Sequence, residues 1–207
     1  MNLFHVISSP RKERSASIEV ADAFIDAWLV KNPNGVVETL NVWETQFPEF
    51  DGEALSAKYA GLEGKELTRD QEKTWSQIKG LANLFICADV ILFSVPMWNF
   101  GIPYKLKHLI DSVSHKDILF TFDERGLLGL LCGKKVVVIA ARGAQLGGDF
   151  PVHDFDHQTA YLKTWSRMVG IEDVHTVVIE KTLFGAEMDK AARDAGRSAA
   201  SALALSL

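Results

Sequence analysis

Short apolar segments alternate with amphipathic segments along almost the whole chain, and this alternation constrains the fold more than any other feature. The apolar segments fall at residues 3–7, 36–42, 90–93, 136–140 and 174–179. The segments that follow them repeat apolar residues at the three- and four-residue spacing of a helix that buries one face. This order predicts an α/β fold: a doubly wound, five-stranded parallel sheet with helices on both faces and ligands at the carboxyl ends of the strands.

Two connections are longer than the rest. Residues 46–68 follow the second predicted strand, and residues 114–133 follow the third predicted helix. Connections longer than the path requires commonly form lids or subunit contacts. No linker or internal repeat divides the chain, so we expect residues 1–207 to form a single domain with a substantial core.

Composition and charge exclude several classes of protein. The formal net charge of −5 provides no basic surface for a nucleic-acid partner. No apolar stretch is long enough to span a bilayer, and the first residues lack the pattern of a signal peptide, so we expect a cytoplasmic protein without a membrane partner. Cys87 and Cys132 are isolated from other cysteines and from histidines, which predicts two buried thiols in a reducing compartment.

The loop after the first predicted strand, residues 8–17, has the composition of an anion site. A loop between a strand and a helix turns backbone N–H groups toward an anion. Ser9, Ser15 and Ser17 add hydroxyl donors, and Arg11 and Arg14 add positive charge. The alternative is that one serine only caps the helix and the charged residues are solvated. The loop has neither the glycine pattern of a dinucleotide site nor the Gly-Lys-Ser/Thr of a triphosphate site, which makes both classes improbable.

The loop after the third predicted strand surrounds one amide, Asn99, with the apolar side chains Met97, Trp98 and Phe100. A planar heteroaromatic ring needs an apolar surface against its face and polar donors along its edge, and this segment supplies both. The alternative is packing beneath the helix that begins after Pro103. Because the segment is a loop at the carboxyl end of a strand, we favour a ligand site.

At this segment the chain resembles the FMN-dependent NAD(P)H azoreductase and quinone reductase family, which has a flavodoxin-like fold. Residues 96–103 read Pro-Met-Trp-Asn-Phe-Gly-Ile-Pro, where the family has Pro-Met-Tyr-Asn-Phe-x-Ile-Pro. Leu106, Lys107 and Asp111 continue the match. The resemblance extends over nearly the whole chain, from Ser9 to Gly170 and Ile171.

The resemblance implies three groups of residues around FMN and a fourth around the substrate. The phosphate would lie on Ser9, Ser15, Ala16 and Ser17, the ring on Met97, Trp98, Asn99 and Phe100, its pyrimidine side on Ala141, Arg142, Gly143 and Ala144, and the substrate beneath Phe120 and Phe122. Backbone donors on the pyrimidine side would stabilise the negative charge of a reduced flavin. The resemblance also implies a homodimer with the flavin sites at the subunit boundary.

The activity that the resemblance implies is an oxidoreduction. FMN would take a hydride from NADH or NADPH and pass two electrons to a quinone or azo compound, in two half-reactions that alternate at one site. Because the flavin carries the chemistry, we predict no catalytic side chain. A non-catalytic flavodoxin-like electron carrier or binding scaffold on the same fold is the alternative.

Several positions depart from the family pattern. Ala141 and Ala144 replace Ser and Gly, which removes one hydroxyl donor and leaves the loop less free to adopt a positive φ. Trp98, Leu119 and Phe122 replace residues with hydroxyls, so we expect a more apolar substrate pocket. These changes leave open a third possibility, a chain that keeps the fold and has lost the cofactor.

The segment His153-Asp154-Phe155-Asp156-His157 resembles a metal site in composition alone. Its spacing matches none of the helical zinc signatures, and a polar loop before a helix has the same composition. We therefore predict no metal.

Overall fold

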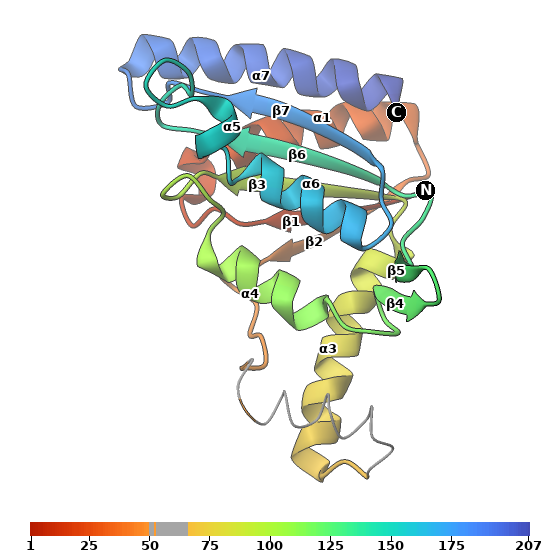
Figure 1. Ribbon diagram of the computed structural model, residues 1–207. Coiled ribbons are helices and arrows are strands. Elements are labelled where there is room, and N and C mark those ends of the chain that lie inside the picture. The colour runs from red at the N-terminus through yellow and green to blue at the C-terminus, as the bar shows by residue number, and fades with distance from the viewer. Residues whose placement is uncertain (50–51, 53–65) are drawn as a thin grey trace.

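Figure 1 shows a computed structural model of the chain, which describes residues 1–49, 52 and 66–207. Its centre is a five-stranded sheet, with all neighbours parallel, in the order β2-β1-β3-β6-β7. The strands are β1 (Asn2–Ile7), β2 (Val36–Asn41), β3 (Val90–Pro96), β6 (Lys135–Ala141) and β7 (Asp173–Ile179). The predicted α/β fold, a doubly wound parallel sheet with helices on both faces, is confirmed.

The helices lie in two layers around the sheet (Figure 1). One layer contains α1 (Ala16–Lys31) and α7 (Ala186–Ser206), and the other contains α3 (Arg69–Cys87), α4 (Tyr104–Val113) and α6 (Thr159–Met168). A sheet covered on both faces buries successive residues of each central strand. The first six residues of β3 are accordingly all buried, and so are the last six of β6.

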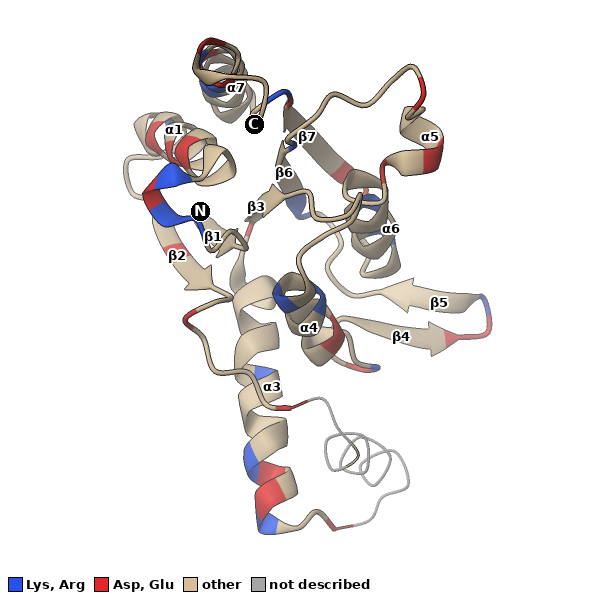
Figure 2. Ribbon diagram, turned by 90° about the vertical axis from the view of Figure 1, so that its left-hand side faces the viewer, with Lys and Arg blue, Asp and Glu red and all other residues tan. Residues whose placement is uncertain are grey.

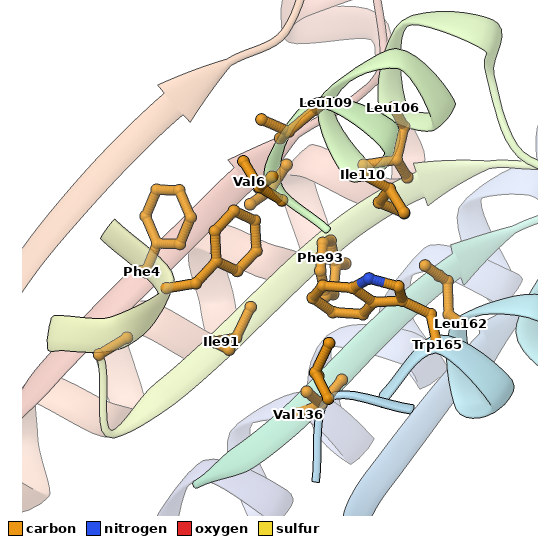
Figure 3. Close-up of a cluster of buried hydrophobic side chains, with 14 of the residues drawn as sticks. Phe4, Val6, Ile91, Phe93, Leu106, Leu109, Ile110, Val136, Leu162 and Trp165 are labelled. Atoms are coloured by element: carbon orange, nitrogen blue, oxygen red, sulfur yellow. The ribbon is translucent and has the colours of Figure 1, made fainter. Parts of the chain in front are cut away.

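Each face of the sheet has its own core. On the side of α1 and α7, Phe24 and Trp28 pack with residues of β3 and β6. On the other side, the Trp165 ring lies edge-on against Phe85 and Phe93, at centroid distances of 5.6 and 5.8 Å (Figure 3). Burying each large apolar side chain contributes about 2–3 kcal/mol, so these two layers fix the sheet and its strand ends in place.

A two-stranded antiparallel hairpin, which the sequence patterns did not predict, lies at the amino-terminal end of the sheet (Figure 1). It consists of β4 (Phe120–Asp123) and β5 (Gly126–Gly129) and belongs to the long connection 114–133. A Cβ on Gly129 would lie 2.0 Å from the Gly170 nitrogen, so only glycine permits this close approach. The other long connection, 46–68, lies mostly outside the described residues.

The prediction of two buried thiols is wrong. Cys87 ends α3 and Cys132 follows the hairpin, and both side chains are exposed. Ala88 and Leu131 beside them are buried, but the two cysteines lie at the ends of elements and not on a face that packs against the sheet. In the part of the chain that the structure describes, no helix combines the length and the apolar character needed to cross a membrane.

Candidate functional site

The loops that follow four of the five parallel strands converge at the carboxyl end of the sheet and enclose a cavity of about 130 Å³. Most of its lining was predicted from the sequence. The lining residues are Ser9, Arg11, Ser15, Ala16, Pro96, Met97, Trp98, Ala141, Gly143, Thr182 and Leu183. The cavity thus brings the predicted phosphate loop, the predicted ring segment and the turn after β6 together.

The loop after β1 directs the start of α1 toward this cavity. Ser8 joins it to β3, because its backbone N–H and its hydroxyl both donate to the Ser94 carbonyl, at 3.1 and 2.8 Å. Ser15 is the N-cap of α1 and accepts a bond from the Ile18 N–H at 3.5 Å. It also lines the cavity, so the anion site and the helix cap, which we set out as alternatives, coincide in one residue.

Ser17 lies behind Ser15 and is not among the residues that line the cavity. It is fully buried, and its Oγ is 3.1 Å from the Ser15 Oγ, so it contacts the cavity only through Ser15. Basic residues of the short 3-10 turn η1 (Lys12–Arg14) lie beside the first turn of α1 (Figure 2). Arg11, which comes just before this turn, lines the cavity and adds positive charge to the partial positive charge of the helix N-terminus.

The loop after β3 contains a tight turn, in which the backbone groups of Trp98 and Gly101 exchange two hydrogen bonds, of 3.0 and 2.9 Å. Asn99 and Phe100 adopt φ values of +48° and +67°, which are uncommon for residues with side chains. The turn separates the predicted ring segment into two parts. Met97 and Trp98 line the cavity, whereas Asn99 and Phe100 do not.

Phe100 instead belongs to an aromatic cluster on the surface. Its ring stacks on Phe150 at a centroid distance of 5.8 Å and lies 5.0 Å from Phe155 in α5 (Val152–Phe155). Phe150 and Phe155 contact each other at 5.2 Å. Backbone conformations of this kind persist where surrounding contacts enforce them, and they concentrate at functional sites.

Arg142 is not among the residues that line the cavity. Its guanidinium group is hydrogen-bonded inside the protein instead. It is 4% exposed and donates to Asp156 at 2.6 Å and to Gln158 and Glu180, each at 3.2 Å. Burial alone would raise the pKa of Asp156, but hydrogen bonds from Thr159 and the charge of Arg142 outweigh it and hold that pKa below its ordinary value. The Arg142 side chain therefore joins the loop after β6 to the segment before α6 and to the loop after β7.

The two alanines of this turn cause no backbone strain. Neither Ala141 nor Ala144 is among the described residues with positive φ, so the replacement of a glycine at Ala144 costs nothing here. Ala141 lines the cavity and Ala144 does not. Gly143 faces Leu183 of the loop after β7, where a Cβ would lie 2.6 Å from Leu183 Cδ1.

Three lining residues, Pro96, Thr182 and Leu183, were not among the predicted ligand residues, and Arg11 was predicted only as a source of positive charge. The signal that could have found Thr182 and Leu183 is their position directly after the fifth apolar strand, since loops at the carboxyl ends of parallel strands form ligand sites.

The predicted substrate residues lie elsewhere in the chain. Phe120 and Phe122 are in the hairpin at the amino-terminal end of the sheet, with their rings 5.8 Å apart, and Phe122 is 56% exposed. The hairpin lies at the amino-terminal end of the sheet (Figure 1), whereas the cavity is lined by loops that follow the carboxyl ends of the strands. Leu119, which we expected beside the substrate, is fully buried in the core. Its contribution to a more apolar pocket is therefore a wrong expectation.

The segment 153–157 uses its polar groups for other contacts. His153 pairs with Asp154 at 3.2 Å, and Asp156 receives bonds from Arg142 and Thr159. Among the described residues, no group of three or more possible metal ligands occurs.

The sheet order and the position of the cavity define the class of the protein, that of the flavodoxin-like α/β proteins. A family model described as flavodoxin-like fold matches residues 1–203. An FMN-dependent NADH:quinone oxidoreductase 2 of Pseudomonas syringae pv. tomato is 53% identical over 183 residues, 88% of each chain. A second such enzyme, from Pseudomonas fluorescens, is 42% identical over 99% of this chain and 96% of its own. The chain belongs to the family of FMN-dependent NADH:quinone oxidoreductases, as the resemblance predicted.

Solved structures agree with this assignment. An FMN-dependent NADH-azoreductase from Bacillus anthracis, determined in complex with FMN, has a TM-score of 0.86 and 29% identity, and the match covers 98% of this chain and 99% of the other. The residues around the cavity fit FMN. Serine hydroxyls and a helix N-terminus at one side suit a phosphate, and the apolar residues Met97 and Trp98 suit a flat ring.

Proposed function

We propose that this chain binds FMN at the cavity between the loops after β1, β3, β6 and β7. Ser9, Ser15 and the first N–H groups of α1 hold the phosphate, and Arg11 adds positive charge. Met97 and Trp98 would provide the apolar surface for the ring, and backbone groups of the turn at Gly143 would bind its polar edge. The observation that carries this proposal is the meeting of all these groups at one cavity.

When bound, FMN would supply the redox chemistry of the proposed reaction, a two-electron transfer from NADH or NADPH to a quinone or azo compound in alternating half-reactions. The protein's own residues hold the phosphate, orient the ring and exclude water. Ser17 supports Ser15 from below, and Arg142 positions the turn after β6 through its bonds to Asp156, Gln158 and Glu180.

We further propose that the active form is a homodimer, in which the hairpin of a second copy covers the site. This arrangement reconciles the predicted substrate role of Phe120 and Phe122 with their distance from the cavity of their own chain. Phe122 and Leu127, which pair across the hairpin, are 56% and 48% exposed, and Leu128 on the opposite face is 38% exposed. Apolar side chains exposed together suit a surface that a second chain covers.

We propose that the partner surface of the dimer includes a groove of about 890 Å³ between α4 and α6. Lys107 and Asp111 form an ion pair of 2.8 Å in its wall, and Tyr161 lies opposite. Burial, assisted by the negative charge of Asp111, raises the pKa of Tyr161 to about 12. The phenol therefore stays protonated at neutral pH and is available to donate a hydrogen bond across an interface.

The experiment that tests the enzyme reading is an anaerobic titration. Purified protein is saturated with FMN, freed of excess, and mixed with NADH or NADPH while its visible absorption is recorded. Rapid bleaching, followed by recovery on addition of a quinone, supports the reductase. Flavin that stays oxidised with both nucleotides would leave only the electron carrier or scaffold, and protein that remains colourless after incubation with FMN would contradict the proposal as a whole.

A matched variant localises the site. Ser15→Asp keeps a good helix cap but places a negative charge where the phosphate is proposed to bind. We expect it to fold normally and to lose FMN affinity by 100-fold or more, ~3 kcal/mol for removing a charge-assisted contact and adding repulsion. Riboflavin, which lacks the phosphate, should bind the variant and the wild type equally.

A further inference from the structure

Trp43 lies in the loop after β2, and none of the residues that the structure describes in this loop lines the cavity. It is half-buried, and its backbone N–H donates to the Asn41 side chain at 3.0 Å, which fixes the start of the loop. Its indole Nε1–H donates to the Ser8 carbonyl at 2.9 Å. Trp43 thus holds the first residue of the proposed phosphate loop from outside.

The same indole ring supports the proposed ring-binding loop. Its centroid lies 5.5 Å from that of Trp98, at an interplanar angle of 47°, and 5.4 Å from Tyr104 in an edge-on contact. Trp98 and Tyr104 in turn lie 6.4 Å apart, so the three rings form a cluster across the loops after β2 and β3. Trp98 is the member of this cluster that lines the cavity.

We infer that Trp43 is a positioning residue that couples the phosphate half of the flavin site to its ring half. Its N–H fixes the backbone of the loop after β1, and its ring fixes the side chain that forms the apolar wall. One residue outside the cavity therefore sets the spacing between the two groups that FMN must contact together. This inference rests on the proposed function, because the ligand whose two halves are coupled is FMN.

The hydrogen bond of Trp43 to Ser8 and its ring contact with Trp98 can be tested separately, by choosing the substitution and by choosing the flavin. Trp43→Phe removes the N–H and keeps an aromatic ring, whereas Trp43→Ala removes both. FMN carries the phosphate, and riboflavin has the same ring without it. The dissociation constants of both flavins, measured by calorimetry for each variant, form the test.

We expect Trp43→Phe to weaken FMN about fivefold, the effect of one lost hydrogen bond, while riboflavin affinity stays within twofold of wild type. Trp43→Ala should weaken riboflavin about tenfold and FMN about 50-fold, because the wall at Trp98 loses its support. It should also shift the visible absorption bands of the bound flavin, which Trp43→Phe should leave in place. Trp75→Phe, in α3 and in ring contact with His115, is the control and should change none of these values.

Two results would overturn the inference while leaving the proposed function intact: equal FMN affinity of wild type and Trp43→Phe, or an equal loss of FMN and riboflavin in that variant. Thermal unfolding of the flavin-free proteins tests whether each variant is folded. If Trp43→Ala does not fold, the comparison of wild type with Trp43→Phe decides. Wild-type protein that binds neither flavin would overturn the proposed function together with the inference.

Discussion

The two ends of the central sheet differ in how they are held together. At the carboxyl end, side chains join the loops: Arg142 bonds to residues of two other segments, and Gln158 donates to the Val95 carbonyl at 2.9 Å. At the amino end, the hairpin meets the rest of the chain through backbone contacts, such as the bond of 2.8 Å from the Leu131 N–H to the Val169 carbonyl. Charged groups are buried at the first end, and apolar groups are exposed at the second.

This difference indicates what each end is built for. A buried network in which every member is bonded fixes loop positions closely, and a cofactor site needs that precision. A hairpin with exposed Phe122 and Leu127 is typical of a surface that is completed by another chain. The predictions below test the two ends in order of their expected effect on the free energy of unfolding.

The largest effect is expected from Arg142→Met, which removes the centre of the network at the carboxyl end. The substitution leaves the buried carboxylate of Asp156, 9% exposed, without its charged partner. We expect a loss of about 3–5 kcal/mol in the free energy of unfolding, measured by urea denaturation.

Two controls belong to this prediction. Arg142→Lys keeps the charge but not the branched donor geometry and should lose less. Lys107→Met breaks an ion pair whose side chains are 47% and 41% exposed and should cost less than about 1 kcal/mol. Similar losses for Arg142→Met and Lys107→Met would contradict the role of the buried network in fixing the carboxyl end.

The fold was predictable because its signal is repeated. Each of the five parallel strands carries its own signal, an apolar run or, in β2, an alternation of apolar and polar residues. Each crossover helix has its own apolar stripe, so one misplaced boundary does not change the topology. The hairpin escaped because β5 reads Gly-Leu-Leu-Gly, too short for a period of two to be recognised. The buried positions of Cys87 and Cys132 were predicted wrongly because local apolar composition does not tell where an element ends.

The site was predictable in part, for a related reason. Ser9, Ser15, Met97 and Trp98 follow directly from the strand ends, and the structure brings them to one cavity. The turn of Asn99 and Phe100 could not be foreseen, since two successive residues with positive φ carry no sequence signature unless glycine or asparagine fills both positions. Contacts such as those of Arg142, which join residues distant in sequence, depend on tertiary structure.

The second prediction concerns His5, a buried histidine of β1. It is 2% exposed, its Nε2 lies 3.0 Å from the Ser94 Oγ, and burial lowers its pKa to about 4. Because the unfolded chain binds a proton near the ordinary value of 6.5 and the folded chain does not, stability falls as the pH decreases from about 6.5 to about 4. The full loss amounts to about 3 kcal/mol.

Urea denaturation at several pH values measures this loss. His5→Gln should remove the decrease across that window, whereas His153→Gln, at an exposed position, should retain it. A His5→Gln protein with the pH dependence of wild type would show that another group is responsible.

The third prediction tests the seat of the hairpin. Gly129→Ala places a methyl group 2.0 Å from the Gly170 nitrogen and 2.2 Å from the Val169 carbonyl carbon, so the hairpin must move. We expect a loss of about 1–3 kcal/mol, as for other overpacked sites. Gly80→Ala, in α3 with open space around it, is the matched control and should instead stabilise the chain by about 0.5–1 kcal/mol.

The smallest effect on folding, and the sharpest test of the two ends, is expected from Phe122→Ala. The side chain is 56% exposed, so the free energy of unfolding of one chain should change by less than about 0.5 kcal/mol. Quinone reduction should nevertheless fall, with a higher KM for the quinone and an unchanged Kd for FMN, because in the proposed dimer the hairpin covers the substrate and does not hold the cofactor.

Mixing this variant with Ser15→Asp decides which chain the hairpin serves. In a dimer of the two variants, the FMN site of the Phe122→Ala chain is covered by the intact hairpin of its partner. Random exchange in an equimolar mixture makes half of the dimers mixed, each with one complete site of two, so about a quarter of wild-type activity should return. If the hairpin serves its own chain, no mixed dimer has a complete site, and activity stays at the level of the separate variants.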